Sequence, residues 1–242
     1  MLFEEIDLLV IKMNGCTKYL GLEKLETIFR SLTSLSDKQL LSVGSGLGTI
    51  EKHIENKIGT NFICIDPAPR SWQHTYPGLL EEEHMPEYPL VPDLVGTKPE
   101  LVKNCNLFLG FCTPNQTAGN YDMHAIFDLG PECIVVSCES SGSAGSTLFL
   151  TWLKMLADKQ AMWTGEFSWV GRMNTAEHPK LDEFASNYSI VSYYTCKLEA
   201  MGGPFHYKYV LIKRKDVKMT EDFEKIEHAD EIYDPDGGCV MM

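Results

Sequence analysis

A short apolar run that leads into a glycine-rich loop constrains the fold of this chain more than any other feature. Residues 40–43 (Leu-Leu-Ser-Val) are followed by residues 44–48 (Gly-Ser-Gly-Leu-Gly), and residues 49–57 then have the pattern of a helix. A second apolar run, residues 61–66, follows at once. A strand, a loop, a helix and another strand predict two parallel strands of one sheet, because parallel strands need a crossover connection.

The remaining apolar runs predict an α/β domain around this unit. Further strands are expected over residues 88–91, 106–111, 132–137, 188–198 and 207–212, and further helices over 99–103, 121–127 and 146–159. The last two strands are separated only by a turn at 202–204, so they are predicted to form an antiparallel hairpin. The fold class is therefore a three-layer α/β sandwich whose seven-stranded sheet is mostly parallel and ends in this hairpin.

Charge and helical spacing divide the chain into three parts. Residues 1–35 are expected to form a helical segment packed on the core, broken near Asn14, and residues 36–215 form the sheet domain. Residues 216–242 hold nine acidic residues against two lysines, about half of the net charge of −13, and are expected to be a flexible tail. Since an acidic surface repels phosphate, nucleic acid is a disfavoured partner.

The eight cysteines form no C-x-x-C pair, and the seven histidines are scattered. This pattern predicts free thiols in a reducing, cytoplasmic compartment and no metal site. No apolar run reaches the roughly 18 residues of a membrane span, and residues 1–7 lack the basic start of a secretory signal.

The glycine-rich loop and the acid that ends the next strand predict a nucleotide site. Ligands of parallel sheets bind at the carboxyl ends of the strands, and glycines let the backbone approach them. Asp66, 22 positions after Gly44, is placed to accept hydrogen bonds from two ribose hydroxyls. A dinucleotide site expects G-x-G-x-x-G, whereas Thr49 stands near the place of that third glycine.

Residues 43–48 and 63–66 resemble the first two motifs of the class I S-adenosylmethionine-dependent methyltransferases, which have a Rossmann-like fold. The closing hairpin is also similar to theirs, in which the last strand inserts antiparallel beside the fifth. The resemblance covers residues 35–214 and implies S-adenosylmethionine as cofactor. It implies these cofactor-binding residues: Gly44, Ser45, Gly46, Gly48, Asp66, Pro67 and Thr113.

Two positions depart from the family pattern. Ser42 stands where many members carry an acid that helps to orient the methionine amino group. Residues 112–115 (Cys-Thr-Pro-Asn) replace the Asn- or Asp-Pro-Pro-aromatic motif of members that methylate amide-like nitrogens, which disfavours base methylation. Glu139, His124 and His206 are candidate general bases, but a cap, a solvated helix face and a turn explain them better, so no catalytic residue is assigned.

The leading hypothesis is an S-adenosylmethionine-dependent methyltransferase that acts on a small molecule or a protein side chain. One alternative is a catalytically degenerate S-adenosylmethionine-binding or scaffold protein on the same fold. A less favoured alternative is an NAD(P)-dependent oxidoreductase. A fold hosts many functions, so the fold does not choose among them.

The last four residues, 239–242 (Cys-Val-Met-Met), have the C-a-a-X form that a prenyltransferase recognises. They predict prenylation of Cys239 and a weak, partial association with membranes. A single lipid chain anchors only marginally, and the acidic residues upstream oppose binding to anionic lipid. A chance match remains the alternative.

Overall fold

The computed structural model describes residues 22–45, 48–65, 105–110, 121–139, 145, 147–160, 179–200, 203–219, 223 and 227–233. Its helices are α2 (Leu22–Leu35), α3 (Thr49–Ile58), α7 (Tyr121–Leu129), α8 (Thr147–Lys159) and α9 (Pro179–Ala185). Its strands are β1 (Leu40–Val43), β2 (Phe62–Ile65), β3 (Asn106–Gly110), β4 (Cys133–Glu139), β5 (Tyr188–Ala200), β6 (Gly203–Arg214) and β7 (Glu227–Tyr233).

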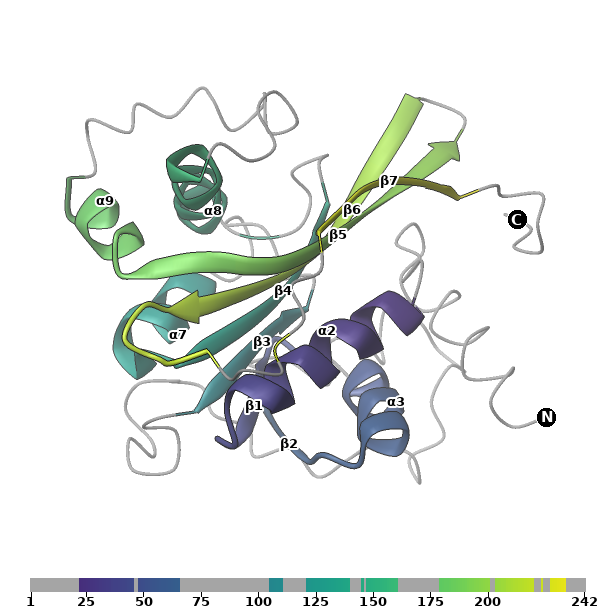
Figure 1. The fold of residues 1–242 in the computed structure, drawn as a ribbon, viewed down its shortest axis with the longest axis horizontal. Helices are drawn as coiled ribbons and strands as arrows, with labels where there is room; N and C mark the ends of the chain where they lie inside the picture. The colour runs from purple at the N-terminus through teal and green to yellow at the C-terminus, as the bar shows by residue number, and fades with distance from the viewer. Residues whose placement is uncertain are drawn as a thin grey trace, which may run out of the picture.

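All seven strands form one sheet in the order β2-β1-β3-β4-β6-β5-β7 (Figure 1). β1 pairs in parallel with β2 and β3, and β3 pairs in parallel with β4. β6 lies between β4 and β5 and is antiparallel to both. The predicted fold class is thus confirmed: the sheet is mostly parallel, and the later strand of the closing hairpin inserts beside the strand expected over 132–137.

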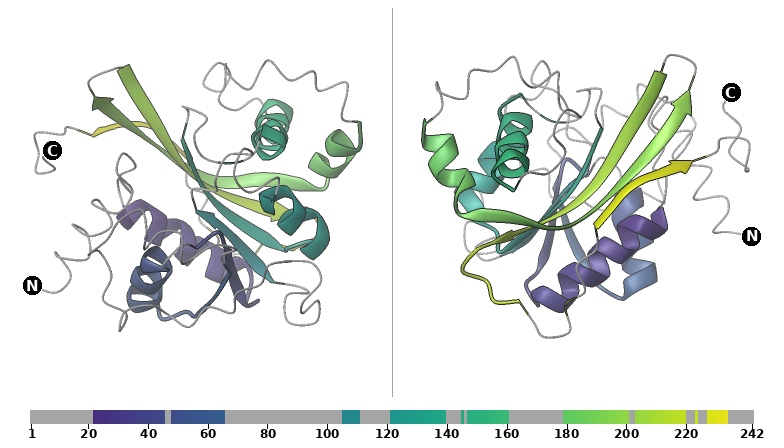
Figure 2. Two further views of the ribbon diagram at one scale, coloured as in Figure 1. Left: turned by 180° about the vertical axis from the view of Figure 1, so that it is seen from behind. Right: turned by 45° about the horizontal axis from the view of Figure 1, so that its top comes forward.

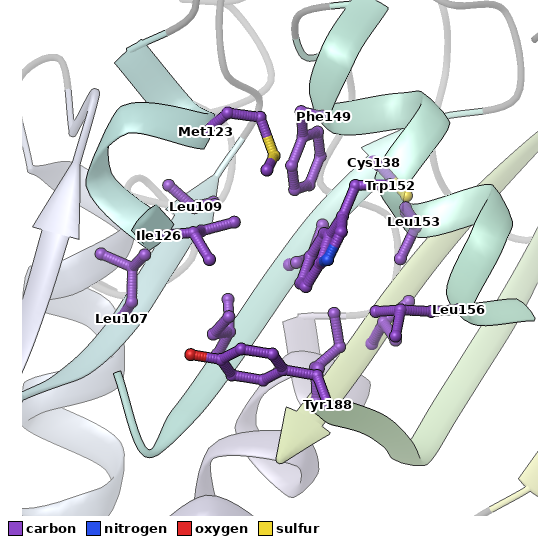
Figure 3. Close-up of a cluster of buried hydrophobic side chains, with 14 of the residues drawn as sticks. Leu107, Leu109, Met123, Ile126, Cys138, Phe149, Trp152, Leu153, Leu156 and Tyr188 are labelled. Atoms are coloured by element: carbon purple, nitrogen blue, oxygen red, sulfur yellow. The ribbon is translucent and has the colours of Figure 1, made fainter. Parts of the chain in front are cut away.

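Helices cover both faces of the sheet, with α2 and α3 on one side and α7, α8 and α9 on the other (Figure 2). Successive strand residues alternate between the two faces, so each strand contributes to both cores. The α7–α9 side buries Leu41, Leu107, Leu109, Ile134, Val136, Met123, Ile126, Phe149, Trp152 and Leu153, among others (Figure 3). The α2–α3 side buries Leu40, Phe108, Val135, Leu211, Leu25, Phe29, Leu32 and Ile54, among others.

Trp152 is the largest side chain that is fully buried among the described residues. It projects from α8 toward the sheet, and its ring meets that of Tyr188 edge to face at 5.8 Å between centroids (Figure 3). The rings of Phe149 and Phe184 lie 6.2 and 6.3 Å away. This aromatic cluster joins α8 to α9 and β5, which follow α8 along the chain.

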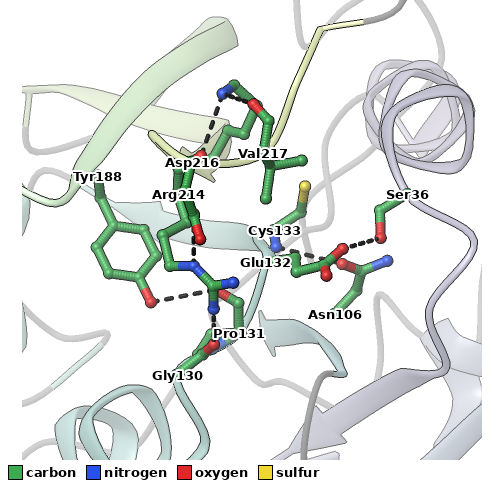
Figure 4. A network of polar contacts seen from close by, with 11 residues as sticks. Ser36, Asn106, Gly130, Pro131, Glu132, Cys133, Tyr188, Arg214, Asp216 and Val217 are labelled. Atoms are coloured by element: carbon green, nitrogen blue, oxygen red, sulfur yellow. Dashed lines mark hydrogen bonds and ion pairs between the residues drawn. The ribbon is translucent and has the colours of Figure 1, made fainter.

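A polar network closes the amino edge of the sheet, where β3 and β4 begin (Figure 4). Ser36 donates from its hydroxyl to Glu132 at 2.9 Å, and the wholly buried Asn106 accepts from the Cys133 N–H at 3.2 Å. Arg214 donates to the Gly130 carbonyl and, at 2.7 Å, to Asp216. These side chains form hydrogen bonds with other residues of the chain, so we assign the amino edge of the sheet a role in stability.

The buried thiols at this edge predict a loss of stability at alkaline pH. Burial raises the pKa of Cys105 from 9.0 to about 11 and that of Cys133 to about 12. The unfolded chain therefore loses these protons first. Stability is fully present below pH 9 and falls as the pH rises toward 11 and 12, by about 1.4 kcal/mol per pH unit for each thiol.

Urea unfolding at pH 8 and at pH 10.5 measures this effect. We expect Cys133→Ala to reduce the difference between the two free energies of unfolding, because it removes the thiol with the larger shift. Met219→Ala is the control, since its exposed thioether does not titrate and its loss should leave the difference unchanged. Equal stability of the wild-type protein at both pH values would contradict the prediction.

Strand β7 corrects the expectation that all of residues 216–242 form a flexible tail, because residues 227–233 pair in parallel with β5. The outer edge of β5 offers unpaired backbone groups, and these hold a segment whose own composition does not favour a strand. Helix α9 was also not expected. The strand expected over 88–91, the helix over 99–103 and the first helix of residues 1–35 lie outside the described residues.

None of the helices in the described part of the chain is long and apolar enough to cross a membrane. Cys239 lies outside that part.

Candidate functional site

The strand order places a switch point at β1 and β3. From β1 the chain continues through α3 to β2 on one side, whereas from β3 it continues through α7 to β4 on the other. Helices α3 and α7 cover opposite faces of the sheet. The two connections therefore diverge at the carboxyl ends of β1 and β3, which is where open parallel sheets bind their ligands.

The glycine-rich loop leaves β1 at this switch point. Gly44 has φ 76° and Gly48 has φ 70°, both in the left-handed region that favours glycine. The Gly48 N–H donates to the Ser45 carbonyl at 2.9 Å, which closes the turn, and Gly48 then forms the N-cap of α3. No side chain caps this helix end, so its first N–H groups face the loop with a favourable dipole for polar ligand atoms.

A buried carboxylate lies beneath the loop. Ser42, the third residue of β1, donates from Oγ to Oε1 of Glu51 on α3 at 2.5 Å. Ser42 is wholly buried, and Glu51 is 3% exposed. An acid in the first turn of a helix is favoured by the helix dipole, and the hydrogen bond from Ser42 offsets part of the cost of burying the carboxylate.

The pairing of β1, β3 and β4 places a second buried serine, Ser137, on the same face of the sheet. Ser42 is level with Phe108 of β3, and Gly110 is level with Ser137 of β4 one step nearer the carboxyl edge. Ser137 shares the α2–α3 face with Ser42 and is 2% exposed. Within the described residues neither its hydroxyl nor that of Ser45 has a hydrogen-bond partner. Gly110 presents no side chain between Ser42 and Ser137.

Three of the expected cofactor-binding residues are described. Gly44, Ser45 and Gly48 surround the start of α3 at the switch point. In the sequence, Asp66 comes directly after Ile65, the last residue of β2. The remaining expected residues, with Asp66, lie outside the described residues: Gly46, Pro67 and Thr113.

The three candidate general bases lie on elements that the structure describes, but their side chains lie outside the described part of the chain. Glu139 is the last residue of β4, His124 lies on α7, and His206 lies on β6 opposite Lys197. Among the described residues, no group of three or more His, Cys, Asp or Glu side chains is arranged to hold a metal ion. No catalytic residue is therefore assigned from the described residues either.

Glu51 was not predicted from the sequence. The family pattern places an acid before the first glycine, where this chain has Ser42, whereas the buried acid comes three residues after the last glycine. The available signal was its position: residue 51 falls in the first turn of the expected helix, on the side that also carries Ile54.

No protein-family profile and no curated protein sequence matches the chain. Solved structures with a similar arrangement include the plantazolicin methyltransferase BpumL in complex with SAH, at 10% identity and a TM-score of 0.42 over 86% of this chain and 89% of that one. Another is the magnesium protoporphyrin IX methyltransferase of Synechocystis with bound SAH, at 12% identity and a TM-score of 0.39 over 80% and 81%. A third is TrmK of M. capricolum in complex with SAH, at 9% identity and a TM-score of 0.37 over 85% and 71%.

Proposed function

We propose that this chain binds S-adenosylmethionine at the carboxyl edge of β1 and β3 and transfers its methyl group to a small molecule or a protein side chain. The observation that carries the proposal is the combination of a glycine loop at the switch point with an antiparallel strand, β6, between β4 and β5. This pairing of loop and strand order is the one that the sequence resemblance implies.

The described residues fit such a cofactor. Gly44 and Gly48, both at positive φ, place no side chain on the loop, and the N-terminus of α3, which no side chain caps, offers backbone donors. The buried hydroxyl of Ser45, which has no hydrogen-bond partner in the described part of the chain, would gain one from a polar ligand atom at the loop. We assign Asp66 to the ribose hydroxyls, and Gly46, Pro67 and Thr113 to the same ligand, from their places in the sequence.

S-adenosylmethionine supplies a reactive methyl sulfonium, so the chain need only hold the cofactor and the acceptor in line and exclude water. This is consistent with a site in which no catalytic base is assigned. The acceptor would approach the same carboxyl edge, past which the β5–β6 hairpin extends: Glu139 at the end of β4 pairs with Tyr207, four residues into β6.

Two other functions compete with methyl transfer on this fold. An NAD(P)-dependent oxidoreductase is disfavoured by Thr49 near the place of the third glycine and by the antiparallel β6. A scaffold or degenerate protein that binds S-adenosylmethionine without transferring its methyl group is favoured by the serine at position 42 and by the absence of an assigned base.

Calorimetric titration of the purified protein with S-adenosylmethionine, S-adenosylhomocysteine and NAD tests the proposal. We expect the first two to bind and NAD not to bind. Binding of NAD alone would establish the oxidoreductase alternative, and binding of none would overturn the cofactor assignment. Transfer of a labelled methyl group from S-adenosylmethionine to a component of a cell extract then distinguishes an enzyme from a binding protein.

Asp66→Ala is expected to weaken S-adenosylmethionine binding about ten- to a hundredfold, or about 1.5–3 kcal/mol, because a bidentate, charge-assisted contact to the ribose is lost. Asp37→Ala is the control, since Asp37 is exposed in the turn before β1. The measurement is the dissociation constant of each folded variant. Equal affinities of wild type and Asp66→Ala would reject this residue as a ligand contact.

A further inference from the structure

Helix α3 carries two polar side chains on its buried face, and the two have partners on different elements. His53, 8% exposed, pairs through Nε2 with Glu26 of α2 at 2.9 Å, so it joins the two helices. Glu51 instead faces the sheet and meets Ser42 at the end of β1. The other buried residues of this face are apolar: Ile50 and Ile54.

We propose that Glu51, held in place by Ser42, is the anionic group that receives the ammonium of the ligand's amino-acid part. The inference rests on the proposed binding of S-adenosylmethionine and assigns the part of that ligand which the glycines and Asp66 do not recognise. Glu51 is the binding residue, and Ser42 is a positioning residue that acts through it.

The position of the carboxylate supports this assignment. Ser42 precedes Gly44 by two residues, and its hydroxyl lies 2.5 Å from Glu51 Oε1. The negative charge is thus one hydrogen bond away from the site that an acidic side chain at position 42 would occupy. A carboxylate that is 3% exposed binds a cation more strongly than one in water, because little solvent screens the pair.

A second observation on the same face also indicates a ligand. The Ser137 hydroxyl is 2% exposed and has no hydrogen-bond partner within the described residues, although buried polar groups are nearly always paired. It lies nearer the carboxyl edge than Ser42, with only Gly110 level with it on the strand between. A polar ligand at this edge would meet the Glu51 carboxylate on one side and the Ser137 hydroxyl on the other.

The simplest alternative is that Glu51 only supports the first turn of α3. Glutamine in its place keeps an amide oxygen that can accept from Ser42 but removes the charge. A structural role should therefore survive Glu51→Gln, whereas recognition of a cation should not. The alternative also predicts no difference between ligands that carry the ammonium group and ligands that lack it.

Titration calorimetry measures the dissociation constants of three ligands: S-adenosylmethionine, S-adenosylhomocysteine and 5′-methylthioadenosine. The third ligand keeps the nucleoside but has no amino-acid group. Glu51→Gln is expected to weaken the first two about ten- to a hundredfold and to leave the third within about twofold. Glu55→Gln is the matched control, one turn along α3, where Glu55 accepts from the Phe62 N–H at 2.8 Å. It should change none of the three.

The double variant Ser42→Asp, Glu51→Gln returns the charge to β1 and keeps a hydrogen-bonding pair. We expect it to recover most of the affinity for S-adenosylmethionine lost in Glu51→Gln. Equal weakening of all three ligands by Glu51→Gln, or no weakening of any, would overturn the inference while leaving the proposed function in place. If wild-type protein binds 5′-methylthioadenosine but neither larger ligand, the inference fails; if it binds none, the proposed function fails with it.

Discussion

Gly48→Ala is expected to lower the affinity for S-adenosylmethionine at least about tenfold and to cost about 1–2 kcal/mol of folding stability. Gly48 holds φ at 70° as the N-cap of α3, a conformation that alanine adopts only with strain. Relief of this strain would rotate the first N–H groups of α3 away from the loop. Titration calorimetry and urea unfolding of the same preparation measure the two effects.

Gly59→Ala separates strain from ligand binding. Gly59 ends the same helix at φ 73°, and a Cβ there would meet no atom within 4 Å. Its stability loss should therefore match that of Gly48→Ala, while its affinity for the ligand should equal that of wild type. If the two variants bind S-adenosylmethionine equally well, the glycine loop is a turn and not a ligand site.

Trp152→Ala is expected to cost about 3–5 kcal/mol of stability and to lower the melting temperature by about 6–20 °C. The indole is wholly buried and fills the space between α8, α9 and β5 beside Tyr188 and Phe184. Its loss leaves a cavity that this rigid aromatic cluster cannot close. Calorimetric melting of the variant measures the change.

Two further variants show whether this loss of stability comes from the buried position of the indole. Trp152→Phe should cost only about 1–2 kcal/mol, because it also removes an indole N–H that has no acceptor among the described residues. Met219→Ala, at a side chain 46% exposed, should stay within about 0.5 kcal/mol of wild type. A melting temperature of Trp152→Ala close to that of Met219→Ala would show that the cluster is not a core.

The parallel part of the sheet could be predicted because its elements carry strong local signals. The strand expected over 40–43 is β1, and the run expected over 106–111 is β3 within one residue. Their fully apolar or nearly apolar composition is typical of strands covered on both faces. The hairpin was predicted with shorter strands than it has, because the polar residues near its turn lack an apolar pattern.

The elements that were missed depend on long-range contacts. β7 contains Glu227, Asp230 and Glu231 and forms a strand only because β5 presents an open edge. α9 is short, but it had a detectable signal in Pro179 at its first position and in the spacing of Leu181 and Phe184. Glu51 could not be placed by motif alone, since the contact with Ser42 exists only when α3 folds back on β1.

The parallel pairing of β7 with β5 decides at which edge of the sheet β7 ends. Tyr233 pairs with Leu198, beyond the level at which β4 ends, so β7 ends at the edge from which the glycine loop leaves β1. Cys239 is six residues further along the sequence, which a chain spans over at most about 22 Å. A lipid, an affinity tag or a fused protein attached at Cys239 would therefore be tethered within that distance of the edge at which we propose the ligand to bind.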